Sequence, residues 1–158
     1  LSFKPYIDCL VSRCAQTFFA LRVLRSNGFS GNVLWDETQA TLINKMLYAS
    51  PLWWGFIDAS DKQRLQSVLN KAVKLGFLPK SQAPLSELCG QADQALFSNV
   101  VHNHNHVLHN LLPPLKMTGH DLRRPTWDRS QLTNDGNSLN RKNFMHRLSN
   151  NNYLYSKL

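Results

Sequence analysis

The sequence is poor in the features that build disulfide frameworks, phosphate loops and membrane spans. Its three cysteines are an odd number and include no C-x-x-C pair, so neither a disulfide framework nor a zinc ribbon is expected. No run approaches the roughly 18 apolar residues of a membrane helix, and no N-terminal pattern marks a signal peptide. The glycines are scattered and form no phosphate-binding loop. We therefore expect an intracellular protein, cytoplasmic or nuclear, in a reducing compartment and with no membrane partner.

The sequence also lacks a recognisable catalytic centre. No Asp-Asp pair occurs, and Asp58 and Asp61 flank a helix start, where capping explains them. A cysteine nucleophile needs a neighbouring base that activates its thiolate, whereas Cys14 lies on the apolar side of a helical pattern. Cys14 and Cys89 are therefore expected in the core. We predict no catalytic residue, no metal ligand and no cofactor in this chain.

Four histidines crowd one short segment and are the one candidate for a metal site. If a single helix ran through the segment, three of them would share a face and could hold zinc. Asn103 and Asn105 instead favour a break in the helix, and no cysteine or carboxylate lies close in sequence. The simpler interpretation is that His106 and His109 are partly buried and hydrogen-bond backbone carbonyls. The histidines are His102, His104, His106 and His109.

What the chain does have is positive charge and enough apolar residues for a core. It has 158 residues, of which 42% are hydrophobic, and a net charge of +8. The balance is +3 over residues 1–112 and +5 over residues 113–158. A basic excess favours a polyanionic partner such as nucleic acid, although no dense basic run appears and many basic proteins bind nothing specific. The chain begins at Leu1 rather than Met, and we expect it to be a piece of a longer protein.

Periodicity predicts an all-α fold of about five helices followed by a basic tail. Apolar residues recur at spacings of three and four, and no segment reads as a strand. We predict a helical domain over 1–112 and a mostly irregular tail over 113–158, with one short helix at 140–149. The predicted helices cover 6–27, a segment starting at 33–36 and ending near 50, 60–76, 85–89 with a restart at 93–101, and 106–112.

The stretch 42–79 organises the rest of the chain. Pro51 pushes the preceding residue out of the helical region, so a helix should end near Ser50. An irregular aromatic corner should follow, with one of Trp53 and Trp54 packed and the other partly exposed. Ser60 and Gln63 have the spacing of a capping box at the start of the next helix.

That next helix carries a stripe of basic residues opposite its apolar side. Arg64, Lys71 and Lys74 are separated by seven and three residues and therefore share a face. Arg22 and Arg25 on the first helix could continue the track. The alternative, a solvated helix face that contacts no phosphate, stays open at this point.

Several motifs together resemble the C-terminal part of reverse transcriptases from non-LTR, LINE-type (jockey-like) retrotransposons. LYASPLWWGF at 47–56 resembles the family, as do DKQR at 61–64, VL at 68–69 and LGFLP at 75–79. The resemblance continues through ELC at 87–89, AD at 92–93, LF at 96–97, NHVLH at 105–109, LLPP at 111–114 and GHDLRR at 119–124. It also includes ALR at 20–22 and LR at 24–25 near the start and NF at 143–144 with RL at 147–148 near the end, so it covers nearly the whole chain.

The resemblance implies the thumb and the helical region after the palm, without the catalytic domains. The palm and fingers, with the aspartates that hold magnesium for the parent polymerase, would lie upstream in the same polyprotein. What remains would grip the RNA and DNA template–primer duplex through its backbone. A helical module that docks on the polymerase core or another subunit is the alternative. The expected nucleic-acid contacts are Arg22, Arg25, Arg64, Lys71, Lys74, Arg123 and Arg124.

Overall fold

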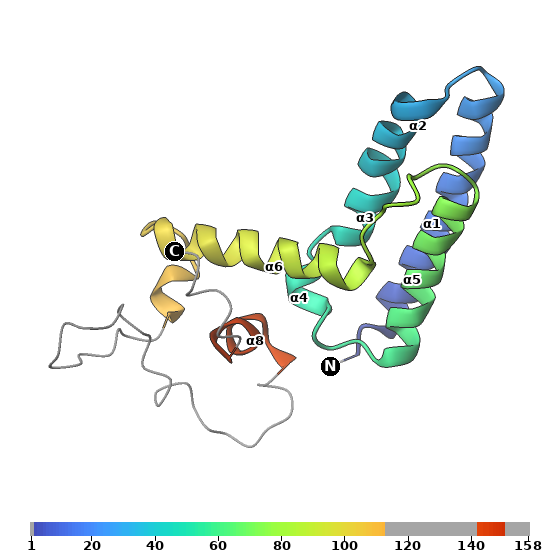
Figure 1. Ribbon diagram of the computed structural model, residues 1–158. Helices are drawn as coiled ribbons and strands as arrows, with labels where there is room; N and C mark the ends of the chain where they lie inside the picture. The colour runs from blue at the N-terminus through green and yellow to red at the C-terminus, as the bar shows by residue number, and fades with distance from the viewer. Residues whose placement is uncertain (1, 113–141, 151–158) are drawn as a thin grey trace, which may run out of the picture. The chain divides into compact units, whose positions relative to one another are not determined.

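The structure is a computed structural model that describes residues 2–112 and 142–150. Within these ranges the chain is all-α, with no strand, as predicted from the sequence (Figure 1). It divides into two compact units, Leu1–Gln91 and Ala92–Leu158, and the division falls inside one helix. The predicted boundary between 112 and 113 concerns a tail that lies mostly outside the described residues, so it stays a prediction.

Helix α1 (Lys4–Ser26) is the longest element of the first unit. Pro5 lies in its first turn, where a missing amide hydrogen is harmless. Gly28 follows its end with φ +92°, a left-handed value that suits glycine and turns the chain back. Its buried side chains are Ile7, Leu10, Cys14, Thr17, Phe18 and Leu21.

The next helical stretch contains a π-helical turn that the periodicity did not predict. Helix α2 (Gly31–Thr38) passes into η1 (Gln39–Ile43) and then into α3 (Asn44–Leu47). The amide of Asn44 bonds the carbonyl of Gln39, five residues back, which defines the π turn. On its N-terminal side the hydroxyl of Thr38 donates to the Leu34 carbonyl at 2.7 Å, and this bond occupies a polar group in the core.

The corner after α3 is more regular than expected. Helix α3 ends at Leu47, before the predicted end near Ser50, and Ala49 has φ +51°. Helix α4 (Ser50–Trp53) starts directly after Ala49, so the predicted irregular corner is wrong at Leu52 and Trp53. Pro51 is responsible, because it fits the first turn of a helix. The expectation for the tryptophans is confirmed: Trp53 is buried and donates from Nε1 to the Tyr48 carbonyl at 3.0 Å, whereas Trp54 is half-buried.

Helix α5 (Ala59–Lys74) starts one residue earlier than predicted and has a different cap. Asp58, in extended conformation, accepts the amide of Asp61 at 2.7 Å. Ser60 lies inside the first turn, so the predicted Ser60–Gln63 capping box is wrong. Asp58 is the N-cap instead of Ser60 because its carboxylate accepts hydrogen bonds from the free amides and is attracted to the positive end of the helix dipole.

Helix α6 (Leu85–His102) is continuous, although the sequence predicted two shorter helices. Gly90 does not break it, since a glycine inside a helix costs only about 1 kcal/mol relative to alanine. The start of α6 is fixed from α5, where the Gln66 side chain accepts the amide of Leu85 at 2.8 Å. The predicted helix at 106–112 is reduced to a 3₁₀ turn, η2 (His109–Leu111).

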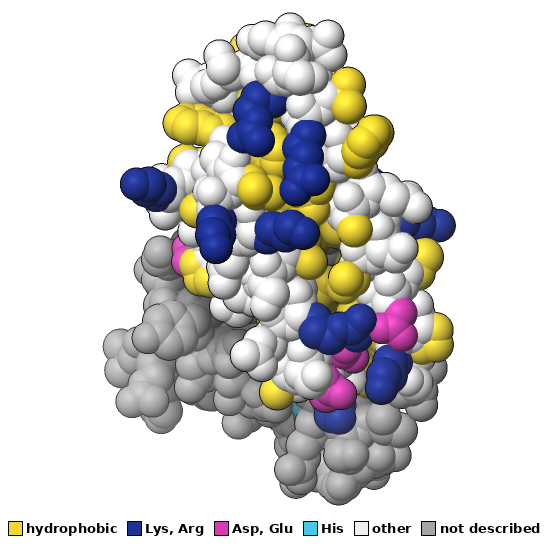
Figure 2. Space-filling model, turned by 90° about the vertical axis from the view of Figure 1, so that its right-hand side faces the viewer, with side chains coloured by type: hydrophobic (Ala, Val, Ile, Leu, Met, Phe, Trp, Pro, Cys, Tyr) yellow, Lys and Arg dark blue, Asp and Glu magenta, His cyan; other side chains and the backbone are white. Residues whose placement is uncertain are grey.

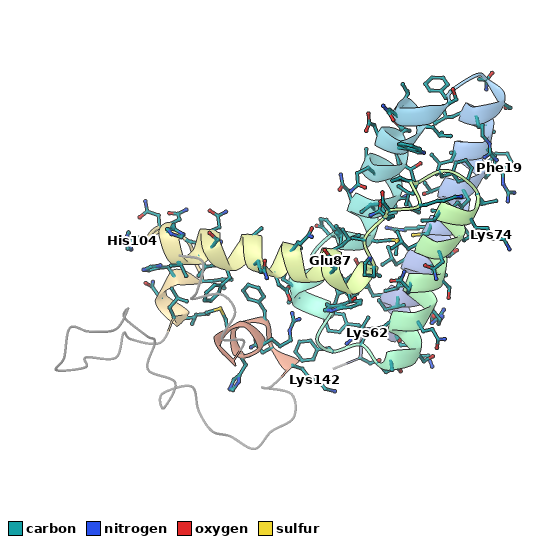
Figure 3. The ribbon with its side chains drawn as sticks, in the orientation of Figure 1. Phe19, Lys62, Lys74, Glu87, His104 and Lys142 are labelled. Atoms are coloured by element: carbon teal, nitrogen blue, oxygen red, sulfur yellow. The ribbon has the colours of Figure 1, made fainter. Side chains whose placement is uncertain are left out.

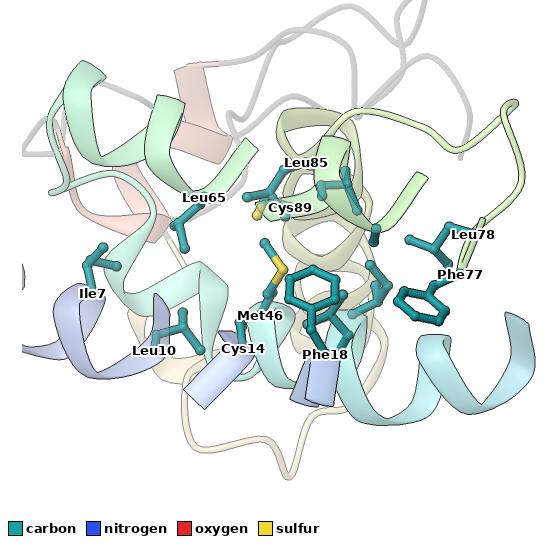
Figure 4. Close-up of a cluster of buried hydrophobic side chains, with 14 of the residues drawn as sticks. Ile7, Leu10, Cys14, Phe18, Met46, Leu65, Phe77, Leu78, Leu85 and Cys89 are labelled. Atoms are coloured by element: carbon teal, nitrogen blue, oxygen red, sulfur yellow. The ribbon is translucent and has the colours of Figure 1, made fainter. Parts of the chain in front are cut away.

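One hydrophobic core holds the first unit together (Figure 4). Side chains from α1, α3, α5, the loop at 75–84 and the start of α6 meet there. Cys14 and Cys89 are fully buried in it, as predicted. Burial of each large aliphatic side chain contributes about 1.5–3 kcal/mol. The residues labelled in Figure 4 are Ile7, Leu10, Cys14, Phe18, Met46, Leu65, Phe77, Leu78, Leu85 and Cys89.

The second unit contains a smaller cluster and an ion pair. Phe144, on helix α8 (Phe144–Asn150), packs with Phe97 of α6. Arg147 of α8 pairs with Asp93 of α6, with Nη1 and Oδ2 2.8 Å apart. The predicted short helix at 140–149 is thus present and docked on α6. None of the helices in the described ranges is both long and apolar enough to cross a membrane.

Candidate nucleic-acid interface

The first helix and the fifth lie side by side and run in the same direction. Arg64 of α5 pairs with Asp8 near the start of α1, with Nη2 and Oδ1 2.7 Å apart. At the other end Arg25 of α1 donates to the carbonyl of Leu75, directly after α5, also at 2.7 Å. The two C-terminal ends therefore lie together, and so do the two N-terminal halves (Figure 1).

Basic side chains gather at the C-terminal end of this pair. Figure 2 shows Lys and Arg side chains over the upper part of this face, around exposed hydrophobic surface. We call the four that α1 and α5 contribute the basic end. None of them forms an ion pair with any residue that the structure describes, so their charge is not offset by a carboxylate. The basic end consists of Arg22, Arg25, Lys71 and Lys74.

Two of the four cations are held in place by aromatic rings. The Arg25 guanidinium lies 4.6 Å from the centre of the Phe77 ring, and Lys71 Nζ lies 5.3 Å from that of Phe18. Phe18 and Phe77 stack on each other in the core with centroids 6.2 Å apart. Cation–π contacts of this kind fix the position of a charge without neutralising it. Arg25 and Lys71 are therefore oriented cations at the surface.

Helix dipoles supply a second, structural reason for cations at this end. Arg25, Lys71 and Lys74 lie in the last turns of their helices, where a positive charge stabilises a helix by about 0.3–1 kcal/mol. Because α1 and α5 are parallel, their two negative ends coincide and attract the same group of cations. The charge cluster thus has a role in folding that does not require a ligand.

Arg64 differs from the other predicted contacts. It lies at the acidic end of the helix pair, bonded to Asp8 and, at 2.8 Å, to Asp61. Hydrogen bonds to Asp8 and then Asp61 raise the pKa of the Arg64 guanidinium further above its ordinary value. Two carboxylates offset its charge, so the predicted stripe of Arg64, Lys71 and Lys74 is divided. Arg123 and Arg124, also predicted as contacts, lie outside the described residues.

The histidines take part in local hydrogen bonds. His102 Nδ1 lies 2.7 Å from the Ser98 carbonyl, and His109 Nδ1 lies 2.8 Å from the Val100 carbonyl. His104 Nδ1 and His109 Nε2 are 3.1 Å apart. His106 Nδ1 accepts the Leu108 amide at 3.1 Å, so it binds an amide and not the carbonyl predicted for it. Within the described ranges no three metal-binding side chains converge.

Cys14 and Cys89 are buried in the core and do not lie at this face. Burial raises the pKa of the Cys14 thiol, which keeps it protonated and unreactive. Cys9 is exposed and lies on a different side of α1 from Cys14.

The aromatic supports of the basic end were missed from the sequence. Phe18 was interpreted only as an apolar position of the first helix and Phe77 only as the start of a loop, because the ring that holds each cation lies far from it in the chain. A pattern search could find only the cations themselves, in the last turns of two helices.

Comparisons with protein-family models, with curated proteins and with solved structures found no match to the chain. The fold and the geometry of the site therefore define the class: a small all-α domain with a basic end formed by two parallel helices.

Proposed function

We propose that this chain is a non-catalytic part of a retrotransposon reverse transcriptase that holds the RNA–DNA template–primer duplex by its backbone. The observation that carries the proposal is the basic end: Arg22, Arg25, Lys71 and Lys74 gather at the C-terminal end of the α1–α5 pair with no carboxylate partner in the described part of the chain. Phosphate contacts by lysine and arginine supply most of the sequence-independent affinity for nucleic acid. The resemblance to the thumb region of LINE-type elements supports the same role.

The cations have a geometry suited to a phosphate backbone. Lys71 and Lys74 are separated by one helical turn, about 5 Å along the axis, and Arg22 and Arg25 by another turn on the adjacent parallel helix. Such an array presents charge along two adjacent lines instead of at one point. It can neutralise several phosphates of one strand and reads no base edge.

The test is duplex binding as a function of salt. Fluorescence anisotropy with a labelled RNA–DNA hybrid should give an affinity that falls linearly in a log–log plot against salt. The variant Lys71→Ala/Lys74→Ala should reduce the slope by about two, roughly 0.9 for each lost phosphate contact. Lys4→Ala, at the opposite end of α1, is the matched control and should leave the slope unchanged. Binding no tighter than about 10⁻⁴ M, or an unchanged slope in the folded double variant, would refute the proposal.

The assignment to a polymerase has a separate test. If the proposal holds, the coding sequence upstream of residue 1 encodes a palm with an Asp-Asp motif. An unrelated domain there would refute the assignment and leave duplex binding as an independent result.

A second candidate, a docking module for the upstream polymerase or another subunit, is favoured by exposed apolar side chains on α1, in the turn after it and on α2. Phe19 and Val23 on α1 are 70% and 44% exposed, and Phe29 and Val33, at the turn into α2 and on α2, are 42% and 58% exposed. Figure 3 shows Phe19 on the outer side of α1. Large exposed aromatics often mark protein interfaces.

The oligomeric state of the isolated chain in solution distinguishes the two candidate functions. A docking module should self-associate as an isolated chain, and Phe19→Ser/Val33→Ser should restore the monomer in sedimentation velocity. A monomeric wild-type chain that binds duplex with the predicted salt slope favours the backbone grip.

A further inference from the structure

A second basic surface lies in a groove between α1 and the π-helical segment. The groove has a volume of ≈ 570 Å³ and is lined from α1, η1, α3 and the residue that follows α3. Ligand pockets in proteins typically measure about 300–1,000 Å³. None of the four residues of the basic end lines it, so it is a separate site within the first unit. The lining residues that carry the argument are Tyr6, Cys9, Arg13, Asn44, Lys45 and Tyr48.

The groove contains two cations and no carboxylate. Arg13 and Lys45 line it, and no Asp or Glu does. The Arg13 carbonyl accepts the Thr17 hydroxyl at 3.1 Å, whereas the Arg13 guanidinium has no hydrogen-bond or ion-pair partner among residues 2–112 and 142–150. Lys45 Nζ donates to Thr17 Oγ1 at 2.9 Å, a contact that positions the ammonium and leaves two of its three N–H groups for a ligand. The charge of the groove therefore matches an anionic ligand.

Tyrosine rings and a π-helical wall complete the site. Tyr48 is 74% exposed at the groove, which leaves its ring available for stacking. The Tyr6 hydroxyl donates to the Tyr48 carbonyl at 3.5 Å, so the two tyrosines lie at the same end. On the opposite wall η1 contributes Ala40 and Thr41. π-Helical turns occur frequently at functional sites, where the extra residue re-aims the helix.

We infer that this groove binds a nucleotide, with its phosphate on Arg13 and Lys45 and its base against Tyr48. An apolar groove with a few converging polar groups is the usual form of a small-ligand site, and base stacking on an aromatic side chain tolerates every base. The shared chemistry is a base linked to a phosphate, from a free nucleotide or from an unpaired position of a strand. The inference goes beyond the duplex grip and concerns different residues.

Cys9 provides a built-in reporter for this site. It lines the groove and is exposed, whereas Cys14 and Cys89 are buried in the core. Iodoacetamide should therefore alkylate Cys9 first in the folded chain, and peptide mass mapping identifies the modified residue. A ligand in the groove should slow this reaction. With AMP at about ten times its Kd, roughly nine tenths of the protein is occupied, so the alkylation rate should fall about tenfold.

Four ligands separate the possible sources of protection. AMP and a short oligo(dA) should each be tested against inorganic phosphate and adenosine at the same concentration. Protection by AMP supports a free nucleotide, and protection by oligo(dA) supports an unpaired nucleotide in a strand. If inorganic phosphate alone or adenosine alone protects Cys9 as well as AMP does, the inference is overturned, because the groove would then recognise only an anion or only a nucleoside. Absence of protection by both AMP and oligo(dA) would overturn it as well.

Variants connect the protection to the groove. Arg13→Gln should raise the Kd for the protecting nucleotide about tenfold, as the loss of one charge-assisted contact does. Tyr48→Ala should weaken nucleotide protection through the lost stacking. Lys4→Gln is the matched control on α1, outside both the groove and the basic end, and should leave the protection unchanged. Circular dichroism checks that each variant is folded. Unaltered protection in folded Arg13→Gln and Tyr48→Ala would refute the site, and duplex binding at the basic end would be unaffected by that result.

Discussion

Asp58 sets the start of α5 because its carboxylate accepts the amide of Asp61. Replacement of an N-cap aspartate by alanine typically costs about 1 kcal/mol. We predict that Asp58→Ala lowers the free energy of unfolding by about that amount, whereas Asp58→Asn, which can still cap, lowers it less. Urea denaturation measures both. Ser60→Ala is the control and should stay within about 0.5 kcal/mol of wild type; an equal loss there would show that Ser60 also caps.

Arg64 was predicted to contact nucleic acid, whereas its bonds to two carboxylates indicate a structural role. Its two carboxylate partners, Asp8 and Asp61, offset its charge, and the Asp61 side chain is nearly buried. Arg64→Ala should therefore lower stability and leave the salt slope for duplex binding unchanged. Lys71→Ala is the matched comparison and should reduce the salt slope for duplex binding. A reduced slope in the Arg64 variant would place this residue back in the interface.

Residue-level features could be predicted from the sequence wherever they depend on neighbours in the chain. The burial of Cys14, the outward direction of Lys71 and Lys74 and the unequal burial of Trp53 and Trp54 follow from local spacing. The partners of Arg64 do not, because Asp8 meets it only after two distant helices have packed. The nucleotide groove was missed for the same reason: α1 and α3 each supply only part of it.

At the scale of helices, the turns at Ala49 and Gly76, like that at Gly28, depend on residues with positive φ. Ala49 has φ +51° and Gly76 has φ +73°, and alanine in this region costs roughly 1–2 kcal/mol. Ala49→Gly should therefore raise the free energy of unfolding by up to about 1 kcal/mol, since glycine also loses more entropy on folding. Thermal or urea denaturation measures the change.

The reverse exchange is the matched experiment. A Cβ at Gly76 would meet no atom within 4 Å, so Gly76→Ala should cost only the backbone strain, about 1–2 kcal/mol. A stabilised Gly76→Ala variant would contradict the left-handed end of α5.

The contact between α6 and α8 should respond to pH through Asp93. Burial raises the pKa of Asp93 above 3.8, and the nearby Arg147 opposes this shift without cancelling it. The folded chain thus keeps the proton to a higher pH than the unfolded chain does. The stabilisation that Asp93 contributes is therefore fully present below pH 3.8 and is lost as the pH rises through the pKa of Asp93 in the folded chain.

Urea unfolding across acidic to neutral pH checks this sign. The difference in unfolding free energy between wild type and Asp93→Asn should decrease as the pH rises and then become constant. A difference that grows with pH would show that Arg147 dominates the environment of Asp93.

The sequence predicted where helices form better than it predicted whether a helix runs on without a break. Pro5, Gly28 and Gly76 fixed ends that the structure reproduces within a few residues. The sequence predicted a short helix ending at Cys89 and a restart near Asp93, but contacts of α6 on both sides of Gly90 support one continuous helix. The π turn at Gln39–Ile43 has no sequence pattern of its own, because it depends on how the two ends of its helix pack.

For the whole molecule, the charge pattern predicts binding without sequence preference. Asp8, Asp61 and Arg64 lie at one end of the α1–α5 pair, and the basic end, whose cations form no ion pair with a described residue, lies at the other (Figure 2). Contacts to phosphates carry no direct sequence information. Two RNA–DNA hybrids of unrelated sequence should therefore bind with similar affinity, and Lys71→Ala/Lys74→Ala should weaken both by the same factor. Competition titration measures the ratio, and a change of that ratio in the variant would indicate base readout.

The π turn has a consequence for how this helix can evolve. Five residues there span what an ordinary turn spans with about four, so η1 is equivalent to an α-helix that has gained one residue. A single-codon deletion in this turn would therefore return the helix to regular winding and leave the residues after it in nearly the same rotation. Lys45 and Tyr48 would keep their place at the groove beside Arg13 of α1. The same deletion in a regular part of the helix, where no π turn absorbs it, would rotate everything after it by about 100°, one residue's share of a turn, and would separate the two halves of the site.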